Sequence, residues 1–218
     1  VEVVEACLAQ IEGYNGKINA VVTLNDAAVD EARQLDKRLA AGDNVGVLAG
    51  IPVGIKDVTQ TKGMRTTFGS VLYADHVPEV DALVVQRLKA AGAVILGKTN
   101  TPEFAAGANT FNEVFGATRN PWNTDLSVGG STGGGAAGLA TGMIALAEGT
   151  DLGGSLRIPA SFCGVVGLRP SPGMIPTWPN DFLWDDMSVT GGMGRTALDV
   201  ALMLEAVAGP SQVTPLHQ

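Results

Sequence analysis

Apolar side chains recur at helical spacing in several stretches of the chain and form short continuous runs in two others. An amphipathic helix repeats its apolar positions about every three to four residues, whereas a short unbroken run is typical of a buried strand. The pattern predicts helices near the start of the chain (Val4, Leu8, Ile11) and over residues 26–41, 81–91, 133–147 and 196–207, and strands over 50–57 and 93–97. A helix followed directly by a strand, as in 81–97, indicates an α/β architecture.

The predicted helices also have predicted caps and apolar faces. Asn25 or Asp26 can cap the helix over 26–41, and Gly42 can end it. The residues expected to face the core recur at helical spacing: Ala28, Ala32, Leu35 and Leu39 in one helix, Leu83, Val84, Leu88 and Ala91 in the next, and Leu198, Ala201, Leu202 and Ala206 in the last.

Composition narrows the class of protein. Charged residues make up only 17% of the 218 residues, and 29 residues are glycine, so a folded chain with many tight turns and close backbone approaches is expected. The net charge of −8 and the lack of a basic run argue against nucleic-acid binding. With two cysteines and two histidines, a zinc site is not expected, and Cys163 is expected to be a buried, inert thiol.

The longest uncharged stretch, residues 126–147, raises the question of a membrane span. Its first third is too polar and too rich in glycine for a helix that faces lipid, so no membrane association is predicted. We find no signal peptide and expect a cytoplasmic protein. The chain begins without methionine inside a helical pattern and stops soon after another, which suggests a segment of something longer.

Three glycine motifs match known patterns without the context that each requires. In the phosphate-loop match over 92–99, the four variable positions are the strand itself, and Pro102 follows too closely for a helix, so Lys98 is expected to be a lysine at a strand end. The dinucleotide fingerprint over 133–138 lacks a preceding strand, and close helix packing explains its glycines better. The nucleophile-elbow match over 129–133 lacks both the strand and a suitable histidine, because the only later one is His217.

Because histidine is scarce, a serine nucleophile in this chain would need a different base. A lysine can serve only when it is neutral, which requires burial or charged neighbours that lower its pKa. Lys56 ends the apolar run 50–56 and fits this description. The residues alone favour a lysine that extends to solvent or pairs with Asp57.

A second glycine-rich segment lies over residues 149–159. The backbone N–H groups of Leu152, Gly153, Gly154 and Ser155 can converge on an anion, since glycine permits the required dihedral angles. An anion site beside a serine hydroxyl suits acyl transfer, in which an oxyanion develops next to the nucleophile. An ordinary tight turn remains the alternative.

The chain resembles the amidase signature family of serine hydrolases over nearly its whole length. The resemblance lies in GIPVGIKD (50–57), GAVILGKTNTPEF (92–104), FGATRNPWN (115–123), GGSTGGGAAG (129–138) and GTDLGGSLRIPASFCGVVGLRPS (149–171). It implies an α/β fold, a mixed β-sheet core flanked by helices, in a single domain over 1–218. Family members are about twice as long, so the C-terminal half is expected to be missing.

The resemblance also implies a Ser-cisSer-Lys triad. Ser155 matches the nucleophile, Ser131 the bridging serine on a cis peptide bond, and Lys56 the base. The remaining expected substrate-binding residues are the oxyanion amides of Leu152, Gly153 and Gly154, and Ala105, which falls where the family lines its acyl pocket. Arg157 and Asp151 are expected to be structural partners beneath the glycine-rich turn. The reaction needs no metal or organic cofactor.

The expected function is hydrolysis of small amides, with hydrophobic or aryl amides favoured by the aromatic segment 176–187 and esters or carbamates as further substrates. The expected partner is the small-molecule amide itself, and a homodimer is left open. Two alternatives remain. One is an amidotransferase subunit that releases ammonia from glutamine to modify charged tRNA, and the other is a non-catalytic fragment of the family. Thr132 stands where the family usually has a second serine, which predicts tuning rather than loss of activity.

Overall fold

A computed structural model of the chain describes residues 1–182 and 184–216. Six strands form one mixed sheet in the order β1-β3-β2-β6-β8-β7, and β4 and β5 form a separate two-stranded sheet. The strands are β1 (Val21–Leu24), β2 (Pro52–Lys56), β3 (Val94–Thr99), β4 (Phe111–Asn112), β5 (Gly116–Ala117), β6 (Leu146–Asp151), β7 (Val166–Leu168) and β8 (Val189–Gly194). The helices are α1 (Glu2–Ile18), α2 (Ala28–Ala40), α3 (Leu83–Ala90), α4 (Gly133–Ala140), α5 (Arg157–Cys163) and α6 (Ala197–Val207), with short 3-10 turns η1 (Val71–Tyr73) and η2 (Glu103–Ala105).

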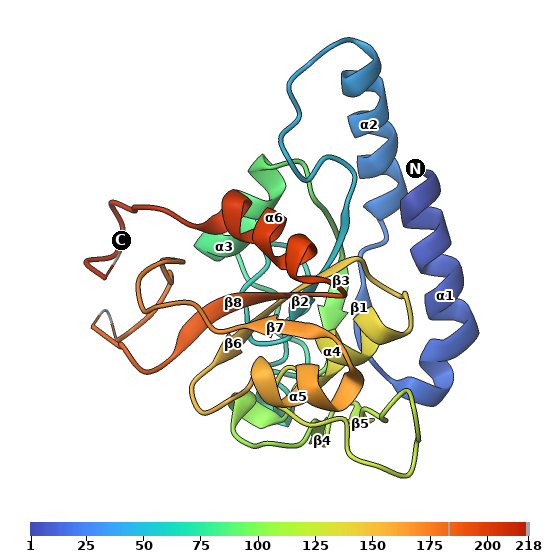
Figure 1. The fold of residues 1–218 in the computed structure, drawn as a ribbon, viewed down its shortest axis with the longest axis vertical. Helices are drawn as coiled ribbons and strands as arrows, with labels where there is room; N and C mark the ends of the chain where they lie inside the picture. Colours follow the sequence, from blue (N-terminus) through green and yellow to red (C-terminus); the bar gives the residue numbers. More distant parts are fainter. Residues whose placement is uncertain (183, 217–218) are drawn as a thin grey trace.

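The centre of the large sheet is parallel and its margins are antiparallel. Strand β2 lies between β3 and β6 and runs parallel to both. The pairs β1–β3, β6–β8 and β7–β8 are antiparallel, which leaves β1 and β7 at the two edges (Figure 1). The mixed sheet with flanking helices confirms the α/β fold class that the resemblance implies.

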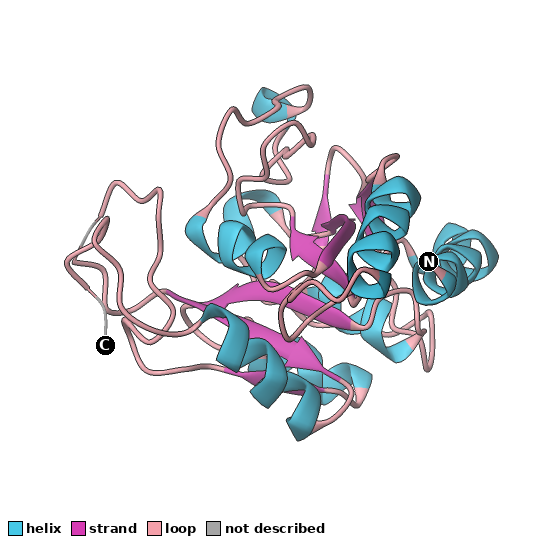
Figure 2. Cartoon of the chain, turned by 90° about the horizontal axis from the view of Figure 1, so that it is seen from above, coloured by secondary structure: helices cyan, strands magenta, loops and turns pink. Residues whose placement is uncertain are grey.

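Helices cover both faces of the sheet, and each face has its own apolar core (Figure 2). One core joins α1, α2, α4 and α5 to residues such as Val94 and Leu96 of β3. The other joins α3 and α6 to residues such as Ile55 of β2 and Ile95 of β3. Successive residues of a strand point to opposite faces, so continuous apolar runs such as 93–97 contribute to both cores.

The predicted elements are found, with corrections at their ends. The helix expected over 133–147 ends at Ala140, because Gly142 adopts a positive φ of 71° and the chain then enters β6. The helix expected over 26–41 begins at Ala28, and Asn25 accepts a hydrogen bond from the Ala27 N–H instead of capping the helix itself.

One predicted apolar face is wrong. Helix α6 buries Val200, Met203 and Val207, whereas Leu198 is 79% exposed and Leu202 is also exposed. Thr196 caps this helix in a reciprocal box with Asp199, which fixes where it starts but not how it is rotated about its axis. In α2, Ala28 and Ala32 are buried as predicted, but Leu39 lies near the end of the helix and is exposed.

The small residues of α4 let this helix enter the core closely enough to bring the preceding serine loop to the sheet. A Cβ atom at Gly134 would lie 2.3 Å from the backbone nitrogen of Asn100, and one at Gly133 would lie 2.2 Å from the Thr110 hydroxyl oxygen. Only glycine therefore fits at these positions, as the packing explanation of the 133–138 motif predicts. Within the described residues, no helix has the length and apolar character needed to span a membrane.

Candidate active site

Lys56 ends β2 and is completely buried. Its Nζ lies 2.6 Å from Ser131 Oγ and 2.9 Å from Thr150 Oγ1. The side chain therefore neither extends to solvent nor pairs with Asp57, whose carboxylate accepts hydrogen bonds from Thr67. Strand β2, at the parallel centre of the sheet, thus places the Lys56 amine beside the Ser131 hydroxyl.

Burial lowers the pKa of Lys56 from its ordinary value to about 7. The negative charges of Glu148 and Asp151 oppose this effect, because each favours the ammonium form. The balance leaves a large neutral fraction near neutral pH, and only a neutral amine can accept a proton.

Ser131 lies on the loop that leads into α4, and the Gly130–Ser131 peptide bond is cis, as the resemblance implies. Gly130 packs against the backbone of Ala108 and Asn109, where a Cβ would lie 2.8 Å from the Asn109 nitrogen. The next residue, Thr132, donates its backbone N–H to the Ser155 carbonyl oxygen at 3.1 Å. The two serine loops are thus joined directly, and the structure brings Lys56, Ser131 and the Ser155 segment to one place.

The Ser155 segment is shaped by a buried carboxylate. Asp151, at the end of β6, accepts hydrogen bonds from the backbone N–H groups of Gly154 (2.8 Å) and Leu156 (3.1 Å). Arg157 donates two more, each at 3.0 Å. Burial alone would raise the pKa of Asp151, but these hydrogen bonds outweigh it and lower the pKa to about 2. Asp151 and Arg157 are thus structural partners beneath the glycine-rich turn.

The N–H groups of this turn differ in what they bind. The Gly154 N–H is engaged by Asp151, and Gly154 itself has a φ of 122°, which an L-residue rarely adopts. In the part of the chain that the structure describes, the N–H groups of Leu152, Gly153 and Ser155 donate to no other protein group. These three amides are available to an oxyanion, whereas Gly154 supplies the bend.

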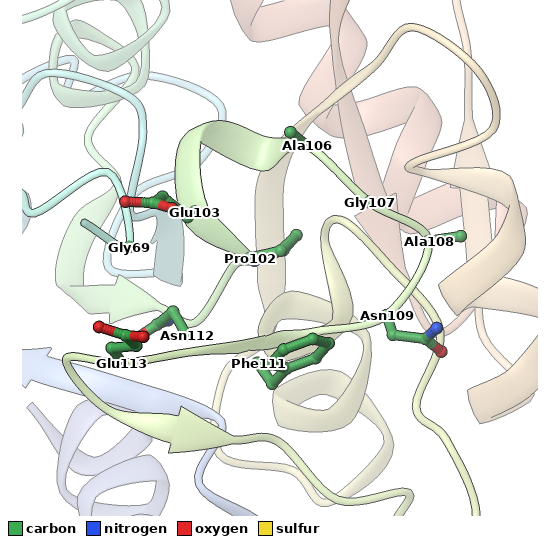
Figure 3. A pocket seen from close by; sticks show the side chains of 10 residues that line it. All are labelled: Gly69, Pro102, Glu103, Ala106, Gly107, Ala108, Asn109, Phe111, Asn112 and Glu113. Carbon is green, nitrogen blue, oxygen red and sulfur yellow. The ribbon is translucent and has the colours of Figure 1, made fainter.

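Ala105 lies at the end of η2, with a positive φ of 56°. The segment that follows it borders a hollow of about 360 Å³, and Figure 3 shows its backbone running from Ala106 through Gly107 to Asn109 along one side. Glu103 and Glu113 carry their carboxylates on another side. Ala108 and Asn109 also contact Gly130, so this hollow adjoins the loop that carries Ser131.

A second, smaller cavity of about 170 Å³ lies beside Thr150. Thr150, which contacts Lys56 Nζ, is one of its lining residues, and Phe68 and Trp178 supply aromatic surface. The described residues that line it carry no charge: Val58, Thr59, Gln60, Phe68, Ala82, Val84, Thr150, Pro176, Thr177, Trp178, Pro179 and Thr190. Phe182 and Trp184 of the aromatic segment are mostly exposed instead, and Leu183 lies outside the described residues.

Three polar residues around the site were not predicted from the sequence. Thr150 contacts Lys56 Nζ, and Glu148 accepts a hydrogen bond from the Lys56 backbone N–H at 3.1 Å. Lys98, expected to be a lysine at a strand end, is fully buried at the second-to-last position of β3. The available signal was a charged residue within a run of small and apolar ones, such as the glutamate of ALAEGT at 145–150.

The remaining candidate residues are Cys163, His76 and His217. Cys163 is a free, buried thiol whose pKa burial raises to about 12, as expected for an inert cysteine. His76 packs against the rings of Phe68 and Tyr73. His217 lies outside the described residues.

The fold and the paired serine loops define the class of protein, an α/β fold of the amidase type. A family model described as Amidase matches residues 2–216. The chain therefore belongs to the amidase family.

Individual relatives agree on the family and differ in what they are named for. The chain is 43% identical over 220 residues to a glutamyl-tRNA(Gln) amidotransferase subunit from Alkaliphilus metalliredigens, and the match covers 100% of this chain and 45% of that protein. A solved bacterial aryl acylamidase is 36% identical with a TM-score of 0.93, covering 100% of this chain and 46% of that one. A chain of a vestigial protein complex linked to the origins of an s-triazine catabolic enzyme is 38% identical with a TM-score of 0.92, covering 100% and 48%. The chain thus spans less than half the length of these relatives.

Proposed function

We propose that this chain carries the catalytic centre of an amidase that hydrolyses carbon–nitrogen bonds of small amides through an acyl-enzyme. The observation that carries the proposal is the 2.6 Å contact between the buried Lys56 Nζ and Ser131 Oγ, on a loop joined to the Ser155 segment by a backbone hydrogen bond. A serine hydroxyl becomes a useful nucleophile only when a positioned base takes its proton. The proposed roles are nucleophile for Ser155, proton relay for Ser131 and base for Lys56.

In the acylation step, Ser155 Oγ forms a bond to the substrate carbonyl carbon. Its proton passes to Ser131 Oγ while the Ser131 proton passes to neutral Lys56 Nζ. The carbonyl oxygen becomes an oxyanion, which the N–H groups of Leu152, Gly153 and Ser155 stabilise. Thr150 holds the Nζ from a second direction, so the amine is directed at Ser131.

The proton then returns along the same path to the substrate nitrogen, and the carbon–nitrogen bond breaks. The free amine leaves, and Ser155 retains the acyl group as an ester. Water attacks this ester with the same relay as its base, which releases the acid and restores the Ser155 hydroxyl. Every proton that the relay accepts is returned, so the cycle needs no additional reactant.

The uncharged cavity beside Thr150 supports an apolar or aryl amide as the substrate. Its wall includes Phe68 and Trp178, and a flat apolar group would be removed from water there. The same feature disfavours glutamine, since a glutamine site needs a positive group for the α-carboxylate. The substrate pocket of the whole protein also depends on sequence beyond this chain, because the matched relatives are more than twice as long.

A second candidate is a glutaminase role in a tRNA amidotransferase, as one component of a complex. The observation that favours it is the 43% identity to a protein named as a glutamyl-tRNA(Gln) amidotransferase subunit. A hydrolysis panel separates the two: aryl amides, aliphatic amides, esters, carbamates and glutamine. Turnover of aryl amides without another protein supports the amidase, whereas glutamine hydrolysis that requires a partner protein supports the amidotransferase.

The nucleophile is tested by labelling the protein that carries this chain with a fluorophosphonate probe. Wild-type protein is expected to be labelled and the Ser155→Ala variant is not. The matched control is Ser161→Ala, which removes a serine hydroxyl from helix α5 near the same turn and is expected to leave labelling intact. Strong labelling of Ser155→Ala would place the nucleophile elsewhere.

A further inference from the structure

Besides Asp151, four ionisable side chains in the described part of the chain are fully buried around the end of β2: Lys56, Asp57, Lys98 and Glu148. Burying a charge is costly unless other charges and hydrogen bonds balance it. The proposed reaction uses only Lys56. The other three groups therefore require a separate explanation.

Glu148 holds the backbone of the catalytic lysine. The β2–β6 ladder pairs Val53 with Leu146 and Gly54 with Ala147. Beyond these pairs, the carboxylate of Glu148 accepts the Lys56 N–H through Oε2 at 3.1 Å. A side chain thus takes over where the backbone pairing stops, and the end of β2 is fixed to β6 by a charged acceptor.

Lys98 is linked to Glu148 through Thr59. The Thr59 hydroxyl donates to Glu148 Oε1 at 3.0 Å, and the Thr59 carbonyl oxygen accepts a hydrogen bond from Lys98 Nζ. Lys98 also donates to Thr61 Oγ1 at 2.9 Å. The β2–β3 register explains why this lysine lies here: it is irregular between Val53 and Gly54, and it then pairs Lys98 with Ile55, next to the glutamate position of β6.

We infer that Glu148 is a positioning residue for Lys56, with Lys98 as its counter-charge and Thr59 as the bridge between them. This inference rests on the proposed role of Lys56 as the base. Glu148 fixes the Lys56 backbone and supplies a negative charge near its amine. Lys98 offsets that charge, so that Glu148 can stay ionised without holding Lys56 as an ammonium ion.

The signs of the expected effects follow from the charges. Glu148 raises the pKa of Lys56, so the loss of its charge is expected to lower that pKa further. Loss of the positive charge of Lys98 is expected to raise the pKa of Glu148 further, so that Glu148 takes up a proton and no longer favours the ammonium form of Lys56. The other charges that face this set stay unchanged in both variants. Asp151 acts on Lys56, and Arg65 acts on Asp57. Lys98 is influenced by Asp57, Asp81 and Lys89.

The test is the pH dependence of kcat/KM for a chromogenic aryl amide, measured with the protein that carries this chain. In wild-type protein, kcat/KM is expected to rise with pH as Lys56 loses its proton, and this rise is the limb followed here. Glu148→Gln keeps a hydrogen-bond acceptor for the Lys56 N–H but removes the charge, and it is expected to move the limb down by about one pH unit. Lys98→Met is expected to move the limb down as well, by up to about one pH unit, because Glu148 loses its counter-charge and becomes neutral. Lys62→Met, which alters an exposed lysine, is the control and is expected to leave the limb in place.

Thr59→Val provides a milder variant, because it removes the hydroxyl donor without removing a charge. It is expected to move the limb in the same direction as Glu148→Gln, by less. If Lys56→Met removes the limb while Glu148→Gln, Lys98→Met and Thr59→Val all leave it in place, the inference is wrong and the proposed function stands. If the limb survives in Lys56→Met, the proposed function itself is wrong. A limb that moves up in Glu148→Gln or Lys98→Met would also overturn the inference, because it would indicate that water has entered the site and hydrated Lys56.

Discussion

The protonation state of Lys56 gives a quantitative prediction. With an ordinary pKa near 10.5, a lysine is neutral in only about 1 of 3,000 molecules at pH 7, whereas a pKa of about 7 leaves about half neutral. Burial thus raises the neutral fraction roughly a thousandfold at neutral pH. Activity is therefore expected to rise with pH, to reach half its maximum near pH 7 and to level off above pH 8.

The assay is the pH profile of kcat/KM from pH 5 to 9.5 with a chromogenic aryl amide, for the protein that carries this chain. Lys56→Met removes the amine but keeps an unbranched side chain in the buried site, and it is expected to remove the limb and lower acylation by about a thousandfold or more. Lys62→Met and His76→Ala are expected to keep the wild-type profile. A limb that disappears in His76→Ala and survives in Lys56→Met would refute the reasoning.

Three further predictions follow from contacts of the structure. Asp151→Asn is expected to lower the free energy of unfolding by about 2 kcal/mol in urea denaturation at pH 7, because it removes a buried carboxylate that pairs with Arg157. The pKa of Asp151 in the folded state lies below its ordinary value, so the difference in stability from wild type should shrink as pH falls from about 4 towards 2. A difference that stays constant over this range would contradict the prediction. Gly97→Ala is expected to lower the free energy of unfolding by about 2 kcal/mol or more, since its Cβ would lie 2.3 Å from the Thr23 carbonyl oxygen. The control, Gly13→Ala, places its Cβ in open space and should not destabilise the protein. Equal melting temperatures for the two variants would argue against the close packing at Gly97. Residues 1–218 produced on their own are expected to self-associate, because β7 is an edge strand of the sheet and Leu198 of α6 is exposed. Light scattering checks this, and a stable, active monomer would count against it.

The sequence predicted where helices and strands lie better than which of their residues are buried. Runs such as 93–97 and the spacing in 81–91 locate strand and helix, because apolar periodicity is a local property. The rotation of α6 depends on what lies across the interface, so the exposed Leu198 and the buried Met203 could not be told apart from spacing alone. The end of α4 at Ala140 depends on a left-handed Gly142, and small apolar residues continue on both sides of it.

The candidate site shows a similar division. The three proposed catalytic residues were assigned from the resemblance to a family, because the apolar run before Lys56 did not by itself predict that this lysine is a buried base. The supporting charges were not predicted, because Lys98 and Glu148 meet through strand pairing between distant segments. A one-residue irregularity in the β2–β3 register decides which face Lys98 joins, and no local pattern encodes it.

The position of β2 between β3 and β6 has a consequence for the order in which the chain folds. Strand β3 follows β2 by about forty residues, but the sequence of β6 is synthesised much later, and Lys56 is enclosed only when β6 and the loop before α4 are in place. Until then the lysine is hydrated, keeps its ordinary charge and cannot activate a serine. Ser155 follows β6 directly, so one late docking event completes both the proposed base and the proposed nucleophile. If these roles hold, a nascent or partly unfolded chain has no reactive hydroxyl, and chemical reactivity at this site reports that the centre of the sheet has closed.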